Sequence, residues 1–88
     1  MTVDKRAFKF KVEVVLKNGV LDPQGEAIKQ SINFNNLGNV LEVKQGKLFE
    51  LTISSKDIKH AFLEVDKICS ELLANSVIED FKYYEVSK

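Results

Sequence analysis

The sequence offers two side chains that could serve as a nucleophile or a general base. His60 is the only histidine, so a Ser-His-Asp or Cys-His arrangement could be built only on it. It falls off the apolar face of the helix expected around it, as a solvated residue would. Cys69, the only cysteine, falls on that apolar face and is typical of a small core hydrophobe. Neither pattern predicts a catalytic site.

The acidic residues and a search for ligand-binding motifs also predict no catalytic or ligand-binding site. Glu79 and Asp80 are adjacent in a predicted strand, so their side chains point to opposite faces and cannot act as a carboxylate pair. The sequence contains no Walker-type GK[ST], GxGxxG or HExxH motif. A single cysteine also excludes an intramolecular disulfide and a cysteine-rich metal site. We therefore expect no catalytic residue, bound cofactor or metal in this chain.

The stretch VLDPQGEAI, residues 20–28, holds the only proline and one of the four glycines. Asp22 is a good N-cap, and Pro23 suits the first helical position. One glycine without a lysine supplies no phosphate-binding nest. Gly25 would cost roughly 0.5 to 1 kcal/mol relative to alanine in a first turn. Helix physics therefore leaves Gln24 and Gly25 unexplained, and we expect a partner protein to approach closely there.

Hydrophobic periodicity predicts six elements, in the order strand, helix, strand, strand, helix, strand. Apolar side chains alternate over residues 8–16, and Asn18 and Gly19 should end that strand. The first helix begins at Pro23 and ends in the polar stretch 33–39. Residues 39–54 predict a hairpin, with Gly46 supplying a positive φ at its turn.

The second helix is the clearest signal in the sequence. Its apolar residues recur at spacings of three and four from Ile58 to Leu73. Ser54 with Asp57 resembles a capping box at its start, and Asn75 could be the left-handed residue past its end. A final strand follows in VIEDFKYYEV, residues 77–86, in which the faces of the two tyrosines stay open.

These elements predict one α+β domain over residues 1–88. Two helices on one face of a four-stranded antiparallel sheet make a ferredoxin-like two-layer sandwich of order βαββαβ. Val15, Leu48 and part of the last strand cannot all face the helices. An exposed apolar sheet face predicts a homodimer or higher oligomer that pairs through the sheet.

The charge balance and hydropathy of the sequence indicate which classes of partner to expect. Lysine plus arginine and aspartate plus glutamate both number 13, so no net field attracts nucleic acid. Phe8 and Phe10 fall on the predicted core face rather than on an RNA-stacking platform. The N-terminus lacks the apolar run of a signal peptide or membrane span. We expect a cytoplasmic protein with no nucleic-acid or membrane partner.

Three stretches together resemble the PurS family, the small subunit of phosphoribosylformylglycinamidine (FGAM) synthase of de novo purine biosynthesis. They are VLDPQGEAI, GKLFELTI and ICSELLANSVIEDFKYYEV, in the family's order and spacing. The resemblance implies a non-catalytic dimeric subunit of a glutamine-dependent, ATP-consuming C–N ligase. Such a subunit brings a large synthetase subunit and a glutaminase subunit together and supports ammonia transfer. ATP, magnesium and glutamine would be used by the complex, with none bound by this chain.

The resemblance also supplies candidate residues for assembly or partner contact. They are Gln24, Gly25, Lys44, Gly46, Lys47, Asn75, Glu79 and Asp80. Relatives often carry arginine before the hairpin glycine, whereas Lys44 and Gln45 cannot make the same bidentate carboxylate contact. Two alternatives remain open: a free-standing small-metabolite-sensing α+β dimer domain, and a structural dimerisation module unrelated to purines.

Overall fold

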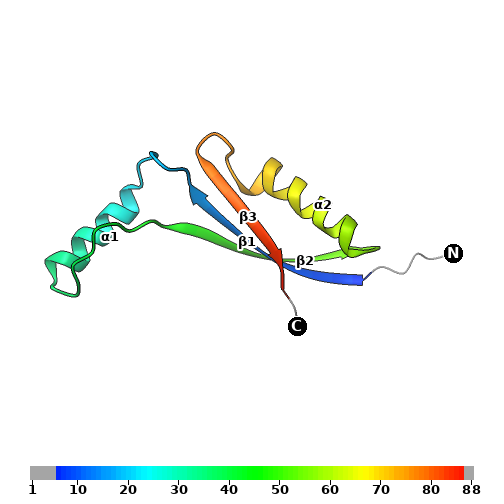
Figure 1. Cartoon of the computed structure of the whole chain (residues 1–88), viewed down its shortest axis with the longest axis horizontal. Helices are drawn as coiled ribbons and strands as arrows, with labels where there is room; N and C mark the ends of the chain where they lie inside the picture. Colours follow the sequence, from blue (N-terminus) through cyan, green and yellow to red (C-terminus); the bar gives the residue numbers. More distant parts are fainter. Residues whose placement is uncertain (1–5, 87–88) are drawn as a thin grey trace.

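The computed structural model describes residues 6–86. The strands and one helix form one end of an elongated molecule, and the other helix forms the opposite end (Figure 1). In chain order the elements are β1 (Arg6–Leu16), α1 (Pro23–Phe34), β2 (Gly46–Ser55), α2 (Ile58–Ile68), the π-helix η1 (Cys69–Leu73) and β3 (Glu79–Glu85). Gly19 has a φ of +87° just after β1, as expected for the end of that strand.

The sheet has three strands in the order β2-β1-β3, and both pairs are antiparallel. The prediction of a four-stranded sheet is therefore wrong, although the α+β class holds. β1 lies at the centre because its alternate residues Phe10, Val12 and Val14 are fully buried. Its register with β3 pairs Val12 with Tyr83, without a bulge.

The missing strand is the first half of the predicted hairpin. β2 begins only at Gly46, and residues 39–45 belong to no strand. They run back along α1 instead, where the side chain of Asn33 exchanges two hydrogen bonds with the backbone of Val40, at 2.8 and 2.9 Å. Gly46 has no positive φ; its missing Cβ would lie 2.7 Å from the carbonyl oxygen of Val14. This glycine therefore permits close strand pairing and makes no turn.

The helix α1 does not lie on the sheet, which is the second correction to the predicted sandwich. It projects beyond the ends of β1 and β2, as Figure 1 shows. We call residues 23–43 the arm, and residues 17–22 with 44–46 the neck. The principal-axis extents are 64 × 30 × 13 Å and the radius of gyration is 17.6 Å, whereas a compact chain of this length would have about 12 Å.

The core lies between the sheet and α2. Ala61, Val65 and Cys69 are fully buried against the inner face of β1, and Phe62 meets the ring of Phe10 edge-on at 5.0 Å. Close packing of this kind supplies most of the stability of a small domain. The predicted apolar face of the second helix is thus confirmed.

The ends of α2 differ from the prediction. Asp57, rather than Ser54, is the N-cap, and its side chain accepts from the backbone N–H of His60. Ser54 is still part of β2. At the other end the chain widens into η1, where the backbone N–H of Ala74 bonds to the carbonyl of Cys69, and Asn75 is not left-handed. The π-turn ends the helix in place of a left-handed cap.

The two tyrosines of β3 face opposite sides of the sheet. Tyr83 lies on the inner face and donates a hydrogen bond to Asp66 of α2, at 2.9 Å. Tyr84 lies on the outer face and donates to Glu13, at 3.3 Å. Val15 and Leu48 are exposed on this outer face, at 44% and 58%, but the face also carries many charges. The outer face is therefore less apolar than the sequence predicts.

Candidate assembly site at the neck

Most of the candidate residues meet where the neck joins the sheet. There β1 ends, β2 begins and β3 begins, so segments far apart in the sequence lie together. A cavity of about 160 Å³ marks the junction. It is lined by Val14, Leu16, Asp22, Gln24, Gln45, Gly46, Lys47 and Glu79. At this size it is smaller than the roughly 300 to 1,000 Å³ of typical small-molecule sites.

Asp22 joins the two segments of the neck. One carboxylate oxygen accepts from the backbone N–H of Gly25 at 2.9 Å, which makes Asp22 the N-cap of α1, as predicted. The other oxygen accepts from the backbone N–H of Gln45, also at 2.9 Å. The N–H of Gln45, followed by that of Gly25, lowers the pKa of Asp22 below its usual value of 3.8, because both bonds favour the charged form.

Helix propensity does not explain Gly25, and the structure supplies a reason for it within the chain. Gly25 is the only buried residue of α1. A Cβ at this position would overlap the carbonyl oxygen of Val43 and lie 2.8 Å from a carboxylate oxygen of Asp22. The backbone that comes close to this glycine is therefore the chain's own. Contact between Gly25 and a partner remains a prediction.

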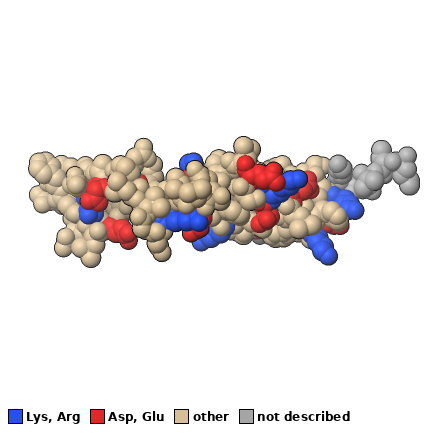
Figure 2. Space-filling model, turned by 90° about the horizontal axis from the view of Figure 1, so that it is seen from above, with Lys and Arg blue, Asp and Glu red and all other residues tan. Residues whose placement is uncertain are grey.

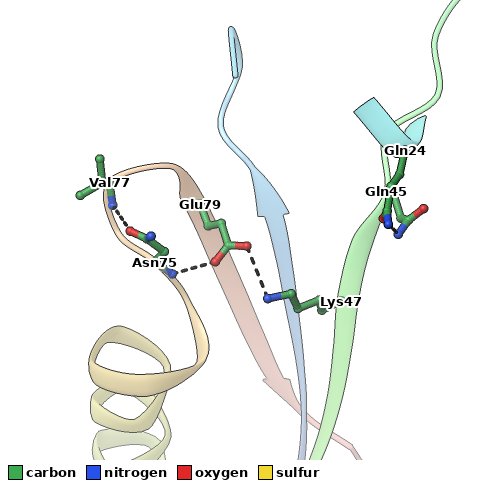
Figure 3. A network of polar contacts seen from close by, with 6 residues as sticks. All are labelled: Gln24, Gln45, Lys47, Asn75, Val77 and Glu79. Atoms are coloured by element: carbon green, nitrogen blue, oxygen red, sulfur yellow. Dashed lines mark hydrogen bonds and ion pairs between the residues drawn. The ribbon is translucent and has the colours of Figure 1, made fainter. Parts of the chain in front are cut away.

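Gln24 projects from the same turn toward the start of β2. Its side-chain oxygen accepts a hydrogen bond from the side-chain amide of Gln45, and Figure 3 shows the two amides facing one another. Lys44, which precedes Gln45 in the chain, donates a hydrogen bond to the side-chain oxygen of Asn18 at 2.8 Å. Gln24 therefore joins the arm to the neck, and Lys44 joins the two segments of the neck.

A second polar network holds the loop before β3 (Figure 3). One oxygen of Glu79 accepts from the backbone N–H of Asn75 at 2.7 Å, and the other lies 3.7 Å from the ammonium of Lys47. The side-chain oxygen of Asn75 accepts from the N–H of Val77 at 3.1 Å. Glu79 is mostly buried, with 13% of its side chain exposed, whereas Lys47 is 60% exposed. The network brings three of the candidates together.

Asp80 is the candidate that the structure separates from the rest. It pairs in register with Val15, so it lies on the outer face, where its carboxylate is 4.0 Å from Lys17. Sequence reasoning also missed a participant, Gln45, and the second role of Asp22. Spacing identifies a cap that binds the backbone N–H three residues further on, but it carries no signal for a contact between positions 22 and 45.

The two side chains that could act as a nucleophile or a general base lie outside the neck, one buried in the core and the other bonded to a carboxylate. Cys69 is fully buried in the core, and burial raises the pKa of its thiol. The ring of His60 lies 2.8 Å from the carboxylate of Asp57 at the exposed start of α2. Within residues 6–86, no group of three or more histidine, cysteine or acidic side chains is placed to hold a metal ion. No helix in this part of the chain is long and apolar enough to cross a bilayer.

Comparison with known proteins agrees with the resemblance seen in the sequence. Residues 9–87 match the family PurS, described as phosphoribosylformylglycinamidine (FGAM) synthase. The chain belongs to the PurS family. Among curated members, the FGAM synthase subunit PurS of Bacillus subtilis is 43% identical over 76 residues, covering 86% of this chain and 89% of the relative. That of Methanocaldococcus jannaschii is 36% identical over 75 residues, covering 85% and 90%.

Solved structures of PurS family members have the same overall arrangement. The PurS subunit from Thermotoga maritima superposes with a TM-score of 0.87 at 30% identity, covering 94% of this chain and 95% of that one. A chain in the structure of PurLQS from the same organism superposes with a TM-score of 0.86 at 31% identity, covering 92% and 99%. Such coverage includes the arm, so its projection away from the sheet is shared.

Proposed function

We propose that this chain is the small assembly subunit of an FGAM synthase in de novo purine biosynthesis. It joins the ATP-dependent synthetase subunit to the glutaminase subunit and supports the passage of ammonia between them. The observation that carries this proposal is the PurS family match over residues 9–87, together with the close similarity to a chain of PurLQS. A free-standing metabolite-sensing domain is not favoured, because the matched relatives are FGAM synthase subunits along nearly their whole length.

The shape of the molecule supports an assembly role. The arm exposes three large apolar side chains, Phe34, Leu37 and Leu41, and the neck exposes Leu21; each of the four is between 77% and 86% exposed. Residues 30–41 carry no charge, and Figure 2 shows that the charged side chains gather over the sheet rather than at the tip of the arm. Apolar surface of this extent is typical of a protein-binding region.

We propose further that the chain pairs with a second copy through the sheet and the arm. β2 is an edge strand, and its inner-face residues Phe49, Leu51 and Ile53 are only partly buried. The apolar arm of one copy placed beside this edge would cover both surfaces. Light scattering at micromolar concentration should give a dimer or higher oligomer, and a monomer would contradict this pairing.

We also propose that the chemistry of the ligase belongs to the other subunits. ATP, magnesium and glutamine act there, in the cytoplasm, and this chain contributes no catalytic residue or cofactor. The fully buried Cys69 and the internal hydrogen bonds of Asp22 and Glu79 support this division. Substitution of His60 or Cys69 by alanine should then leave the turnover of an assembled complex unchanged.

Reconstitution tests the proposed function. The cognate large and glutaminase subunits are assayed for FGAM formation from glutamine, with and without this protein. We expect glutamine-dependent synthesis to require it, while the large subunit alone still uses added ammonia. A full glutamine-dependent rate in its absence would refute the proposal.

A further inference from the structure

The neck is joined across its width by side chains alone. The β1–β2 ladder ends at the pair Val15–Gly46, and beyond it no backbone–backbone hydrogen bond links residues 17–22 to residues 44–46. The bonds that do cross are those of Asp22 to the N–H of Gln45 and of Lys44 to Asn18. The amide of Gln45 also bonds to Gln24 at the base of the arm.

The neck is also hollow on both sides. Besides the cavity of about 160 Å³ on the side of the sheet, a second cavity of about 330 Å³ lies toward the arm, between residues 20–29 and 41–44. Asp22 lines both. No residue of the neck is buried, and surface pockets flank it, so the neck has little resistance to bending other than its hydrogen bonds.

From these contacts we infer that Asp22 is a positioning residue that fixes the angle between the arm and the sheet. One of its oxygens holds the first turn of α1, and the other holds the residue that precedes β2. It is the single side chain that binds the backbone on both sides of the junction among residues 6–86. Without it, the neck bends and the arm samples a range of angles.

The consequence for assembly rests on the proposed function. A partner surface that must meet both the sheet and the arm binds one angle, so a fixed angle removes an ordering cost from association. Loss of the Asp22 bridge should therefore weaken assembly by roughly tenfold, the effect of losing one hydrogen bond to a charged group. The arm itself should remain folded.

Distances between the arm and the sheet test this inference directly. Spin labels are placed at Gln30→Cys on α1 and Thr52→Cys on β2, both exposed in the chain, while the buried Cys69 is left in place. Labelled protein is diluted with unlabelled protein so that distances within one copy are measured. The wild type should give one narrow distance distribution, and Asp22→Ala should broaden it.

Two further variants separate the neck from the helix. Gln45→Pro removes the N–H that bonds to Asp22, together with the side-chain amide that bonds to Gln24, but leaves the N-cap of α1, so it should broaden the distribution without loss of helical circular dichroism. Asp80→Ala removes an exposed carboxylate on the outer face and should leave the distribution narrow. An unchanged distribution in both Asp22→Ala and Gln45→Pro would overturn the inference.

This result is independent of the reconstitution assay. If the distributions broaden but wild-type protein does not support FGAM formation, the neck bridge stands and the proposed function fails. If the wild type supports synthesis and both neck variants keep a narrow distribution, the proposed function stands and the neck inference fails.

Discussion

The two ends of this molecule are stabilised in different ways. The sheet end has six fully buried apolar side chains: Phe10, Val12, Val14, Ala61, Val65 and Cys69. The helix of the arm buries only Gly25, and its apolar residues Ile28 and Phe34 are exposed. Burial folds the first region by itself, whereas hydrogen bonds at the neck hold the second in place and leave its apolar surface for a partner.

Truncation of one aromatic ring in each region should show this contrast most strongly. Phe10→Ala removes a fully buried ring from the core and should cost about 3 to 5 kcal/mol of unfolding free energy. Phe34→Ala removes a ring that is 85% exposed and should change the intrinsic stability of a single copy by less than about 0.5 kcal/mol. Urea denaturation at several protein concentrations measures both.

Concentration dependence separates folding from association in that experiment. Phe34→Ala should lower the denaturation midpoint at high concentration and make it fall less on dilution than in the wild type, because weaker pairing of copies leaves less stabilisation to lose. Equal losses for the two variants at the lowest concentration would mean that the arm has a core of its own and that the two ends do not differ in how they are stabilised.

Glycine substitutions test how closely the arm is packed at its base. Gly25→Ala places a methyl group against the carbonyl oxygen of Val43 and should cost about 1 to 3 kcal/mol, measured by the loss of arm protection in hydrogen exchange. Gly38→Ala is the matched control, since its Cβ would meet nothing closer than 3.7 Å and its φ is not positive. It should be neutral or stabilise by up to about 1 kcal/mol. Equal effects would show that contact with Val43 is unimportant.

The network before β3 should contribute less, because it is partly exposed. A double-mutant cycle of Glu79→Gln and Lys47→Met isolates the ion pair, whose atoms lie 3.7 Å apart. We expect a coupling of about 0.2 to 1 kcal/mol, measured by urea denaturation. Lys17→Met with Asp80→Asn provides the control on the outer face, where the atoms are 4.0 Å apart and the carboxylate side chain is 67% exposed. A larger coupling in that control pair would contradict the ranking.

The same contrast explains which features the sequence could predict. The apolar face of α2 and the alternation of β1 were predictable because each pattern reports burial against the chain itself. Asp22 and Pro23 at the start of α1 were predictable because capping is local. The core role of Cys69 followed from its place on the apolar face.

The predictions that were wrong depended on long-range contacts, which local sequence patterns do not encode. Leu41 and Val43 alternate like a strand, but alternation does not specify a pairing partner, and in this chain residues 39–45 run beside α1. The compact sandwich was wrong for the same reason, since it assumed that each apolar helix face packs within its own chain. At the neck, a bond between positions 22 and 45 depends on where the arm turns back, which the three-residue spacing of a cap cannot reveal.

The smallest effect concerns the ionisation of Asp22. Its pKa is lower in the folded chain than in the unfolded chain, because two backbone N–H groups bind the charged form. Ionisation therefore favours the bridged neck above the ordinary aspartate pKa, and this contribution is lost as pH falls through the folded value. In NMR titrations the amides of Gly25 and Gln45 should shift together with one midpoint below 3.8, while the amide of His60 follows Asp57 separately. Different midpoints for Gly25 and Gln45 would mean that one carboxylate does not hold both sides of the neck, and the arm would then need another support.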